Sequence, residues 1–161
     1  VGNIPYYLTS RLIRTVFEKW PHPEKIVLMV QKEVAQRICA KPPEMSLLAV
    51  SVQYYSKPKI ISYVSRNSFY PAPEVDSAII KLETQNLELK TNEVKNFFKV
   101  VRAGFAGKRK QLANNLTAGL KISKQEIRQK LTLIDIDPQR RAETLTIEEW
   151  QRITNFLFSQ G

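Results

Sequence analysis

Apolar residues near the start of the chain change their spacing twice. Within residues 12–20 they recur every three or four positions, which predicts an amphipathic helix that ends before Pro21. Residues 25–31 form a nearly continuous apolar run rich in β-branched side chains, which indicates a strand buried on both faces. Residues 32–40 return to helical spacing and stop before Pro42. The pattern therefore predicts a helix, a strand and a second helix.

The next stretch predicts a further helix and two more strands. Residues 46–56 are ambiguous between helix and strand, and we favour a helix because a helical crossover is needed before the next strands. Residues 58–65 and 75–83 have the alternation of strands, and the Phe-Tyr-Pro-Ala-Pro sequence at 69–73 predicts a stiff turn between them. This alternation of helices and strands is typical of an α/β sandwich.

After about residue 89 the strand signal disappears and apolar residues predict four helices. Two of these helices open with the pattern of a capping box, Ser123 with Glu126 and Thr146 with Glu149. We therefore divide the chain into an α/β part, residues 1–89, and a small all-α part, residues 90–161.

The charge of the chain is strongly positive, with a formal net charge of +10. Residues 1–89 hold 11 Lys and Arg against 8 Asp and Glu, a net of +3, whereas residues 90–161 hold 14 against 7, a net of +7. Lys and Arg bind polyanions by releasing counterions from phosphates, so this asymmetry favours a nucleic-acid partner for the second part. A basic surface without a ligand is the alternative.

Several other classes of site have little support in the composition. Cys39 and His22 are the single cysteine and histidine, so we expect no disulfide within the chain, no metal site and no Cys–His nucleophile pair. A buried structural thiol is the interpretation that we favour for Cys39. These absences indicate a cytoplasmic location, and because the apolar runs are too short to cross a bilayer we expect no membrane partner.

The stretch Asn3-Ile4-Pro5-Tyr6 carries the clearest chemical signal. The side-chain oxygen of Asn3 and the backbone carbonyl of Ile4 can each accept one N–H of an adenine amine, which draws its nitrogen toward tetrahedral geometry and frees the lone pair for methyl transfer. Pro5 stiffens the loop by fixing φ. Tyr6 offers a face on which a base can stack, worth about 1–3 kcal/mol. An ordinary strand-to-helix turn is the alternative interpretation of this tetrad.

Five segments follow one another along the chain, at residues 2–7, 31–38, 51–55, 69–78 and 105–116. Together they resemble the small-subunit ribosomal RNA adenine N6,N6-dimethyltransferases of the KsgA type, in the expected order and over essentially the whole chain. The resemblance implies a partial Rossmann-like class I methyltransferase sheet followed by a small all-α domain. The first part would be the C-terminal half of the catalytic domain, and the second a helical RNA-binding domain.

The resemblance also implies roles for single residues in the first part. Asn3, Ile4, Pro5 and Tyr6 would form the loop that holds the target base, with Asn3 also beside the cofactor. Phe69 would be a second aromatic wall against the adenine. A core residue at the end of a strand is the alternative for Phe69.

In the second part, the resemblance assigns RNA-phosphate contacts to Lys108, Arg109 and Lys110. The segment departs from the family pattern at Lys108, where an arginine is usual, and at Gln111, where threonine is common. Lysine keeps the charge but lacks the planar fork that grips a phosphate with two hydrogen bonds. A solvated start of a helix is the alternative for these residues.

The cofactor implied by the resemblance is S-adenosylmethionine. Methyltransferases of this class bind it with a glycine-rich turn and an acidic ribose contact, both upstream of the Asn-Ile-Pro-Tyr loop. No G-x-G turn occurs in the sequence, and its one G-x-x-G, from Gly104 to Gly107, lies in a basic helical region. Because the chain begins with Val1, we expect that an upstream part has been removed. We predict that this chain alone does not bind the cofactor productively and is inactive.

The resemblance implies that the full-length parent is a monomer that dimethylates adenosines near the 3′ end of small-subunit rRNA during maturation of the small ribosomal subunit. Two alternatives stay open. One is a non-catalytic rRNA-binding or ribosome-assembly module, against which the intact Asn3 and Tyr6 argue. The other is a large-subunit rRNA adenine methyltransferase of the antibiotic-resistance type.

Overall fold

The computed structural model describes residues 2–3, 15–16, 23–85 and 91–158, and its chain divides into two compact units. The first unit consists of Val1–Ala40 and Leu48–Leu87, and the second of Lys41–Leu47 and Glu88–Gly161. The short segment Lys41–Leu47 thus belongs to the second unit, although the sequence division placed it in the first.

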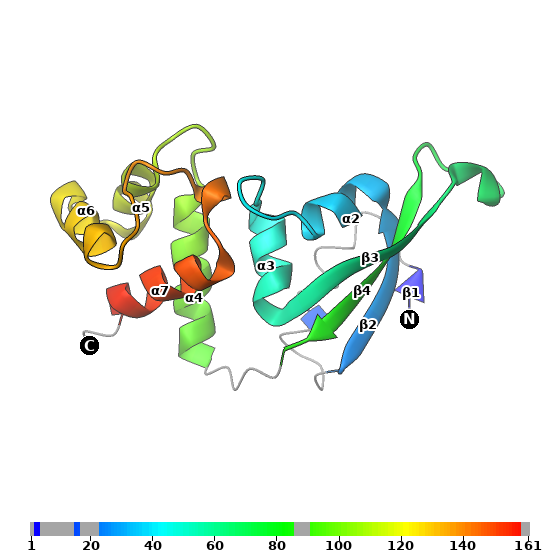
Figure 1. Ribbon diagram of the computed structural model, residues 1–161, viewed down its shortest axis with the longest axis horizontal. Coiled ribbons are helices and arrows are strands. Elements are labelled where there is room, and N and C mark those ends of the chain that lie inside the picture. Colours follow the sequence, from blue (N-terminus) through cyan, green and yellow to red (C-terminus); the bar gives the residue numbers. More distant parts are fainter. Residues whose placement is uncertain (1, 4–14, 17–22, 86–90, 159–161) are drawn as a thin grey trace. The chain divides into compact units, whose positions relative to one another are not determined.

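The first unit is built on a four-stranded sheet (Figure 1). Its strands are β1 (Gly2–Asn3), β2 (Lys25–Gln31), β3 (Ser56–Val64) and β4 (Ser77–Thr84). Their order in the sheet is β1-β2-β4-β3, with β1 parallel to β2 and the other two pairs antiparallel. The predicted strands at 25–31, 58–65 and 75–83 are confirmed, within two residues at each end.

Helix α2 (Lys32–Ile38) lies against β2, β4 and β3. Leu28 and Val30, on one face of β2, have buried side chains, while Val27 and Met29 on the other face are only half-buried. The prediction that this strand is buried on both faces was therefore wrong. An unbroken apolar run cannot tell which alternate positions a helix covers.

Helix α3 (Leu47–Tyr55) confirms the preference for a helix in the ambiguous stretch. Within the first unit, the side-chain amide of Gln53 donates to the carbonyls of Ile38 and Ala40, both at 2.8 Å. The end of α2 and the middle of α3 are thereby joined by one side chain. Cys39 lies at this end of α2 and is half-buried, and burial raises the pKa of its thiol.

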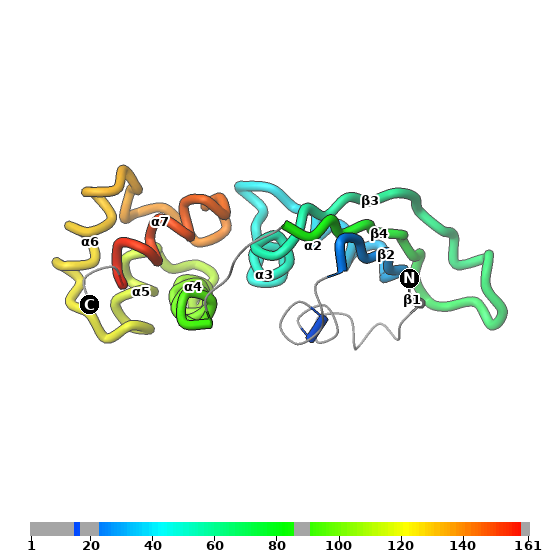
Figure 2. The backbone as a smooth tube through the Cα atoms, turned by 90° about the horizontal axis from the view of Figure 1, so that it is seen from below, coloured from blue at the N-terminus to red at the C-terminus, as the bar shows by residue number. Residues whose placement is uncertain are grey.

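The second unit contains the four predicted helices, which Figure 2 shows with α4 seen nearly end-on. They are α4 (Thr91–Gly104), α5 (Leu112–Leu120), α6 (Lys124–Leu133) and α7 (Ile147–Phe158). Helix α4 packs against α5 and α7, and the fully buried Trp150 of α7 lies in the core.

Two glycines allow these helices to approach closely. A Cβ atom at Gly104 would lie 2.3 Å from the Trp150 ring, and one at Gly119 would lie 2.5 Å from the Cβ of Ala103. Side chains do not tolerate such distances, so glycine is required where α4 meets α7 and α5.

Both predicted helix caps are present. The Ser123 hydroxyl accepts from the Glu126 amide at 3.2 Å, and Glu126 itself pairs with Lys130 at 3.0 Å. At α7 the capping box is reciprocal, because Thr146 and Glu149 each accept from the other's backbone amide, at 3.2 and 2.8 Å.

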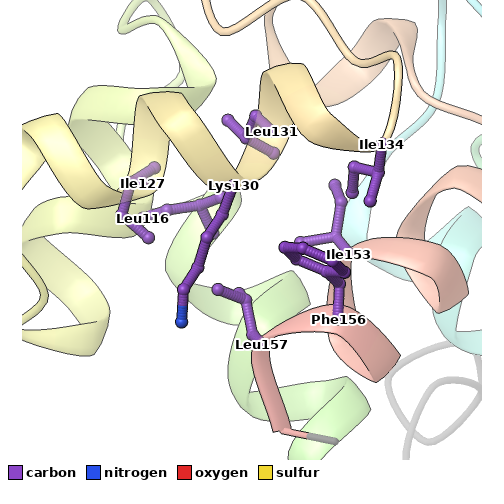
Figure 3. Close-up of a pocket in the computed structure, with 8 residues that line it drawn as sticks. All are labelled: Leu116, Ile127, Lys130, Leu131, Ile134, Ile153, Phe156 and Leu157. Atoms are coloured by element: carbon purple, nitrogen blue, oxygen red, sulfur yellow. The ribbon is translucent and has the colours of Figure 1, made fainter. Parts of the chain in front are cut away.

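A narrow apolar crevice runs between α5, α6 and α7 (Figure 3). It is lined by Leu116, Ile127, Lys130, Leu131, Ile134, Ile153, Phe156 and Leu157. Its empty space is about 180 Å³ with open solvent included, and no part of it is wide enough for a water molecule. The crevice is a seam of helix packing and offers no room for a ligand.

Candidate functional site

The predicted target-base loop begins at the end of β1. Gly2 is paired with Leu28 and Asn3 with Met29, in parallel register. The carboxyl ends of β1 and β2 therefore lie at the same edge of the sheet, the edge at which open α/β sheets bind their ligands. Ile4, Pro5 and Tyr6 lie outside the described residues, and for Asn3 the structure describes the backbone alone.

Phe69 lies in a connection that leaves the same edge. Gln31, the last residue of β2, is paired with Ser77, and Ser77 is paired with Val64, the last residue of β3. Phe69 follows a short 3₁₀ turn (Arg66–Ser68) in the link between β3 and β4, and its side chain is half-buried. The topology thus brings the backbone of Asn3 and the link that carries Phe69 to one edge of the sheet.

The link is fastened by Asp76, a residue to which the sequence analysis gave no role. The carboxylate of Asp76 accepts from the backbone amide of Arg66 at 3.1 Å, and the guanidinium of Arg66 donates to the carbonyl of Glu74 at 3.2 Å. The Lys32 ammonium lies 3.9 Å from the same carboxylate, and the Lys32 amide donates to the Asp76 carbonyl at 3.0 Å. These contacts close the link into a loop tied to the start of α2, and we call them the Asp76 clasp. Asp76 belongs to the segment 69–78, so the signal was present in the sequence.

The predicted RNA-contact residues lie between α4 and α5. Lys108, Arg109 and Lys110 are all exposed, in a turn where the Lys110 amide donates to the Gly107 carbonyl at 3.0 Å. They precede α5, whose first residue is Leu112. The three cations thus extend from one short loop, which we call the basic loop (residues 107–110).

Asn115 supports the basic loop through its side chain. The sequence analysis did not name it as a site residue. Its side-chain amide is buried and donates to the carbonyls of Gly104 at 2.6 Å and Gly107 at 3.0 Å. A Cβ atom at Gly107 would lie 2.8 Å from the Asn115 side-chain oxygen, so the loop fits closely over this side chain. The signal was the position of Asn115 in the segment 105–116, although only the fold shows what it binds.

The start of α5 does not offer free backbone amides in its first two positions. The Leu112 amide donates to the carbonyl of Arg140 at 2.7 Å, and the Ala113 amide to that of Pro138 at 3.2 Å. A helix N-terminus binds phosphate through such amides, and these two already have partners. These two amides are therefore not available to a phosphate, so the predicted phosphate contacts would have to come from the side chains of the basic loop.

Arg140 is a structural cation. Its guanidinium binds both carboxylate oxygens of Glu149, at 2.6 and 3.1 Å, and also donates to the hydroxyl and carbonyl of Thr144, at 3.1 and 2.5 Å. Burial alone would raise the pKa of Glu149, but hydrogen bonds from Arg140 and the Thr146 amide, with the charge of Arg140, outweigh it and lower that pKa. This network holds the 138–140 segment against the start of α5.

Among the described glycines, Gly2 lies within β1, and Gly104, Gly107 and Gly119 lie in the helical unit against neighbouring side chains or backbone. In the described part of the chain, no group of three or more His, Cys, Asp or Glu could hold a metal ion. No described helix is both long and apolar enough to cross a membrane.

Comparisons with known proteins agree over almost the whole chain. The family model "Ribosomal RNA adenine dimethylase" matches residues 1–159. "Ribosomal RNA small subunit methyltransferase A" of Dehalococcoides mccartyi (strain CBDB1) is 48% identical over 95% of this chain and 53% of its own length. The protein of the same name from Desulfitobacterium hafniense (strain DSM 10664 / DCB-2) is 40% identical over 96% of this chain and 56% of its own length. The chain thus spans about half the length of these curated relatives.

Solved structures show the same fold. A dimethyladenosine transferase from Plasmodium falciparum superposes with a TM-score of 0.81 at 27% identity, over 94% of this chain and 63% of that one. The 23S rRNA methyltransferase ErmE superposes with a TM-score of 0.72 at 24% identity, over 97% of this chain and 63% of that one. At this identity the match shows a likeness of fold alone. The chain belongs to the ribosomal RNA adenine dimethylase family.

Proposed function

We propose that the full-length protein containing this chain dimethylates N6 of adenosines near the 3′ end of small-subunit rRNA, in the cytoplasm and during maturation of the small ribosomal subunit. The observation that carries this proposal is the 48% identity, over 95% of the chain, to a protein named ribosomal RNA small subunit methyltransferase A. Its substrates are adenosines of immature small ribosomal subunits.

The acceptor chemistry belongs to the loop that follows β1. The Asn3 side-chain oxygen and the Ile4 carbonyl accept the two N–H groups of the adenine amine, so that the nitrogen lone pair is freed from the ring. Tyr6 and Phe69 stack on the base, and Pro5 keeps the loop stiff. S-adenosylmethionine supplies the methyl group when bound. No general base is required, because the amine proton becomes acidic only after the methyl group is attached.

The arrangement of the sheet supports this division of labour. Asn3 ends β1 at the edge from which the link bearing Phe69 also leaves, and the Asp76 clasp fastens that link. Extruding a base from its stack costs a few kcal/mol, which aromatic contacts on both sides can offset. Because the described residues lack a glycine-rich turn after a strand, we propose that this chain alone is inactive.

RNA docking belongs to the basic loop of the second unit. Lys108, Arg109 and Lys110 are exposed on a turn that Asn115 shapes, so their charges can meet phosphates with little rearrangement. These contacts orient the RNA and carry no base information, so the choice of adenosine rests on the first unit and on the shape of the rRNA.

Methylation of ribosomal subunits tests the proposal. The full-length protein is incubated with immature small subunits and labelled S-adenosylmethionine, and N6,N6-dimethyladenosine is measured by mass spectrometry of the digested rRNA. Asn3→Ala should lower the rate by about 100-fold, similar to the loss of other preorganised hydrogen-bonding groups. The control Asn92→Ala removes an exposed amide from α4 and should keep the wild-type rate. Absence of dimethyladenosine with the wild-type protein would refute the proposal.

The two alternatives give different results in the same assay. A large-subunit enzyme would methylate large-subunit rRNA in preference to small-subunit rRNA, and the 24% identity to ErmE does not favour that outcome. A non-catalytic assembly factor would bind small subunits without methylating them. An Asn3→Ala variant that supports subunit assembly but not methylation would show that both roles exist in one protein.

A further inference from the structure

The exposed apolar side chains of the first unit gather on one hairpin. Within the described residues of that unit, the exposed large apolar side chains are Ile61, Tyr63, Tyr70 and Val75. All four lie at the end of β3 or in the link between β3 and β4. We call this stretch, residues 61–76, the hairpin arm. Tyr70 is 102% exposed and Tyr63 is 55% exposed, although both are large aromatic residues. Such side chains commonly mark a surface that binds a partner.

The link part of the hairpin arm, residues 65–76, extends from the carboxyl edge of the sheet, beyond the pairs Gln31 with Ser77 and Val64 with Ser77. Figures 1 and 2 both show it projecting past α2, away from the helices of its unit. Tyr70 directly follows Phe69, the proposed wall of the target-base site. A ligand that placed a base against Phe69 would therefore bring its neighbouring groups toward Tyr70.

The hairpin arm is held rigid by hydrogen bonds. Besides the Asp76 clasp, the Ser65 hydroxyl accepts from the Asn67 amide at 3.3 Å, and the Ser68 amide donates to the Ser65 carbonyl at 3.0 Å. The Phe69 amide donates to the Arg66 carbonyl at 3.3 Å. Tyr70 is thus presented by an ordered turn, so that binding costs less conformational entropy than with a loose loop.

The chemistry around the hairpin arm fits nucleotides better than a protein strand. β3 is an edge strand, but Pro58 lacks an N–H, Lys57 and Lys59 are exposed, and the register shifts between Ile60 and Ser62. These features prevent another strand from pairing with the edge. With strand pairing disfavoured, the exposed tyrosines and the cations of this region are the groups that can recognise a partner.

One cation lies over the Tyr63 ring, and a second, Arg66, belongs to the hairpin arm itself. The Lys32 ammonium is 5.5 Å from the centre of the Tyr63 ring, and Arg66 is exposed within the hairpin arm. Of the two carboxylates of the hairpin arm, Asp76 already binds the Arg66 amide and faces Lys32, and Glu74 is exposed. Flat aromatic faces with flanking cations are the features by which proteins bind single-stranded RNA.

We propose that the hairpin arm binds the single-stranded RNA next to the target adenosine, with Tyr70 stacking on a flanking base. This inference rests on the proposed function and adds a second stacking position beyond Phe69. Loss of the Tyr70 ring removes one stacking contact with a base and should weaken RNA binding about tenfold. Because stacking releases no counterions, the salt dependence of binding should not change.

The experiment uses the full-length protein and single-stranded RNA that contains the methylated adenosine, with the fluorescent base 2-aminopurine on either side of it in two separate oligonucleotides. Stacking quenches this fluorescence. The wild type and Tyr70→Phe should quench one of the two probes, whereas Tyr70→Ala should not quench it and should bind about tenfold more weakly. Tyr70 is fully exposed, so its truncation removes no packing. Leu133→Ala is the matched control, because Leu133 is a 73% exposed apolar residue of the second unit.

Three results would overturn the inference. Tyr70→Ala could bind and quench like the wild type, it could lose affinity with a reduced salt slope, or it could change the oligomeric state, which would make the hairpin arm a protein interface. The proposed function fails separately, if the wild-type protein methylates no subunit. If the wild type methylates small subunits and Tyr70→Ala binds and methylates normally, only the inference about the hairpin arm is wrong.

Discussion

Asn115 and Gly104 show how single residues shape the second unit. The buried amide of Asn115 satisfies one carbonyl at the end of α4 and one in the basic loop, and the missing side chain of Gly104 makes room for the Trp150 ring. Both residues act through contacts within the second unit. Their effects should therefore be seen first in stability.

Replacing Asn115 by Ala should destabilise the protein. The carbonyls of Gly104 and Gly107 would lose their donor in a place with little access to water, which costs about 1–3 kcal/mol of unfolding free energy. Chemical denaturation of the protein measures this value. Asn114→Ala, at the less buried neighbouring position, is the control and should change stability by less than about 0.5 kcal/mol. An equal loss in both variants would contradict the role of Asn115.

Gly104→Ala should be destabilising because of crowding. The new methyl group would lie 2.3 Å from the Trp150 ring, and overpacking of this kind costs about 1–3 kcal/mol. The penalty should shrink when Trp150 is replaced by Leu, because the smaller side chain frees the space. A double-mutant cycle in thermal or chemical unfolding measures this coupling. Strictly additive effects would place the cause elsewhere.

Two elements depend on charged side chains that lie at their ends. α7 begins with the reciprocal capping box, and Arg140 grips its Glu149 from the preceding loop. The link between β3 and β4 is fastened by the Asp76 clasp. In each case a carboxylate organises backbone that a helix or strand leaves unpaired.

The stability of the second unit should fall in acid because of Glu149. Its pKa in the folded protein is lowered below the ordinary value of 4.5, so its stabilising contribution is present above that pH and is lost as the pH falls through the folded pKa. Glu149→Gln should lower stability near pH 7 by about 1–2 kcal/mol and reduce the loss below pH 4.5. Denaturant titrations at several pH values measure both effects. Glu148→Gln, an exposed neighbour, should behave as the wild type does.

Asp76→Ala should slow methyl transfer through Phe69. Without the carboxylate the Arg66 amide loses its acceptor, so the ring of Phe69 is no longer held in place. If Asp76 acts in this way, adding Phe69→Ala to Asp76→Ala should cost much less than Phe69→Ala costs alone. Single-turnover methylation rates on small subunits, measured for the wild type, both single variants and the double variant, complete this double-mutant cycle. Glu33→Ala, which removes an exposed carboxylate from α2, controls for the change in charge. Additive losses would make Asp76 a structural residue unrelated to Phe69.

At the scale of the whole molecule, the predicted functional residues are divided between two compact units. The predicted target-base residues belong to the first unit and the basic loop to the second, while the segment 41–47 of the intervening chain also belongs to the second. If the full-length protein binds rRNA as proposed, the charge of +10 on this chain should make the RNA affinity depend on salt.

The basic loop should account for part of that dependence. Replacing Lys108, Arg109 and Lys110 by Ala should reduce the slope of log affinity against log salt by about 2 to 3, at about 0.7–0.9 for each phosphate contact. Fluorescence anisotropy with rRNA fragments between low and moderate salt measures the slope. The triple variant of Lys121, Lys124 and Arg128 removes the same charge from other exposed positions and should change the slope less. Equal changes in both variants would mean a diffuse field without a docking loop.

Much of the fold followed from local signals. The strand at 25–31, the capping box at Thr146 and the four later helices are set by residue spacing and by side chains that bind their own backbone, which neighbours in the chain reveal. The strand was predicted to be buried on both faces, and this was wrong because the burial of each face depends on which other elements cover it. The roles of Asn3, Phe69 and the basic-loop cations remain predictions.

By itself, the sequence determined the order of helices and strands, the basic character of the second half and the resemblance to rRNA adenine dimethyltransferases. Those features depend on spacing, composition and short motifs. Only the tertiary structure decided that the link bearing Phe69 leaves the edge where Asn3 ends, that Asp76 fastens that link, and that Asn115 supports the basic loop. These contacts join residues from different elements, and sequence spacing does not specify which elements meet.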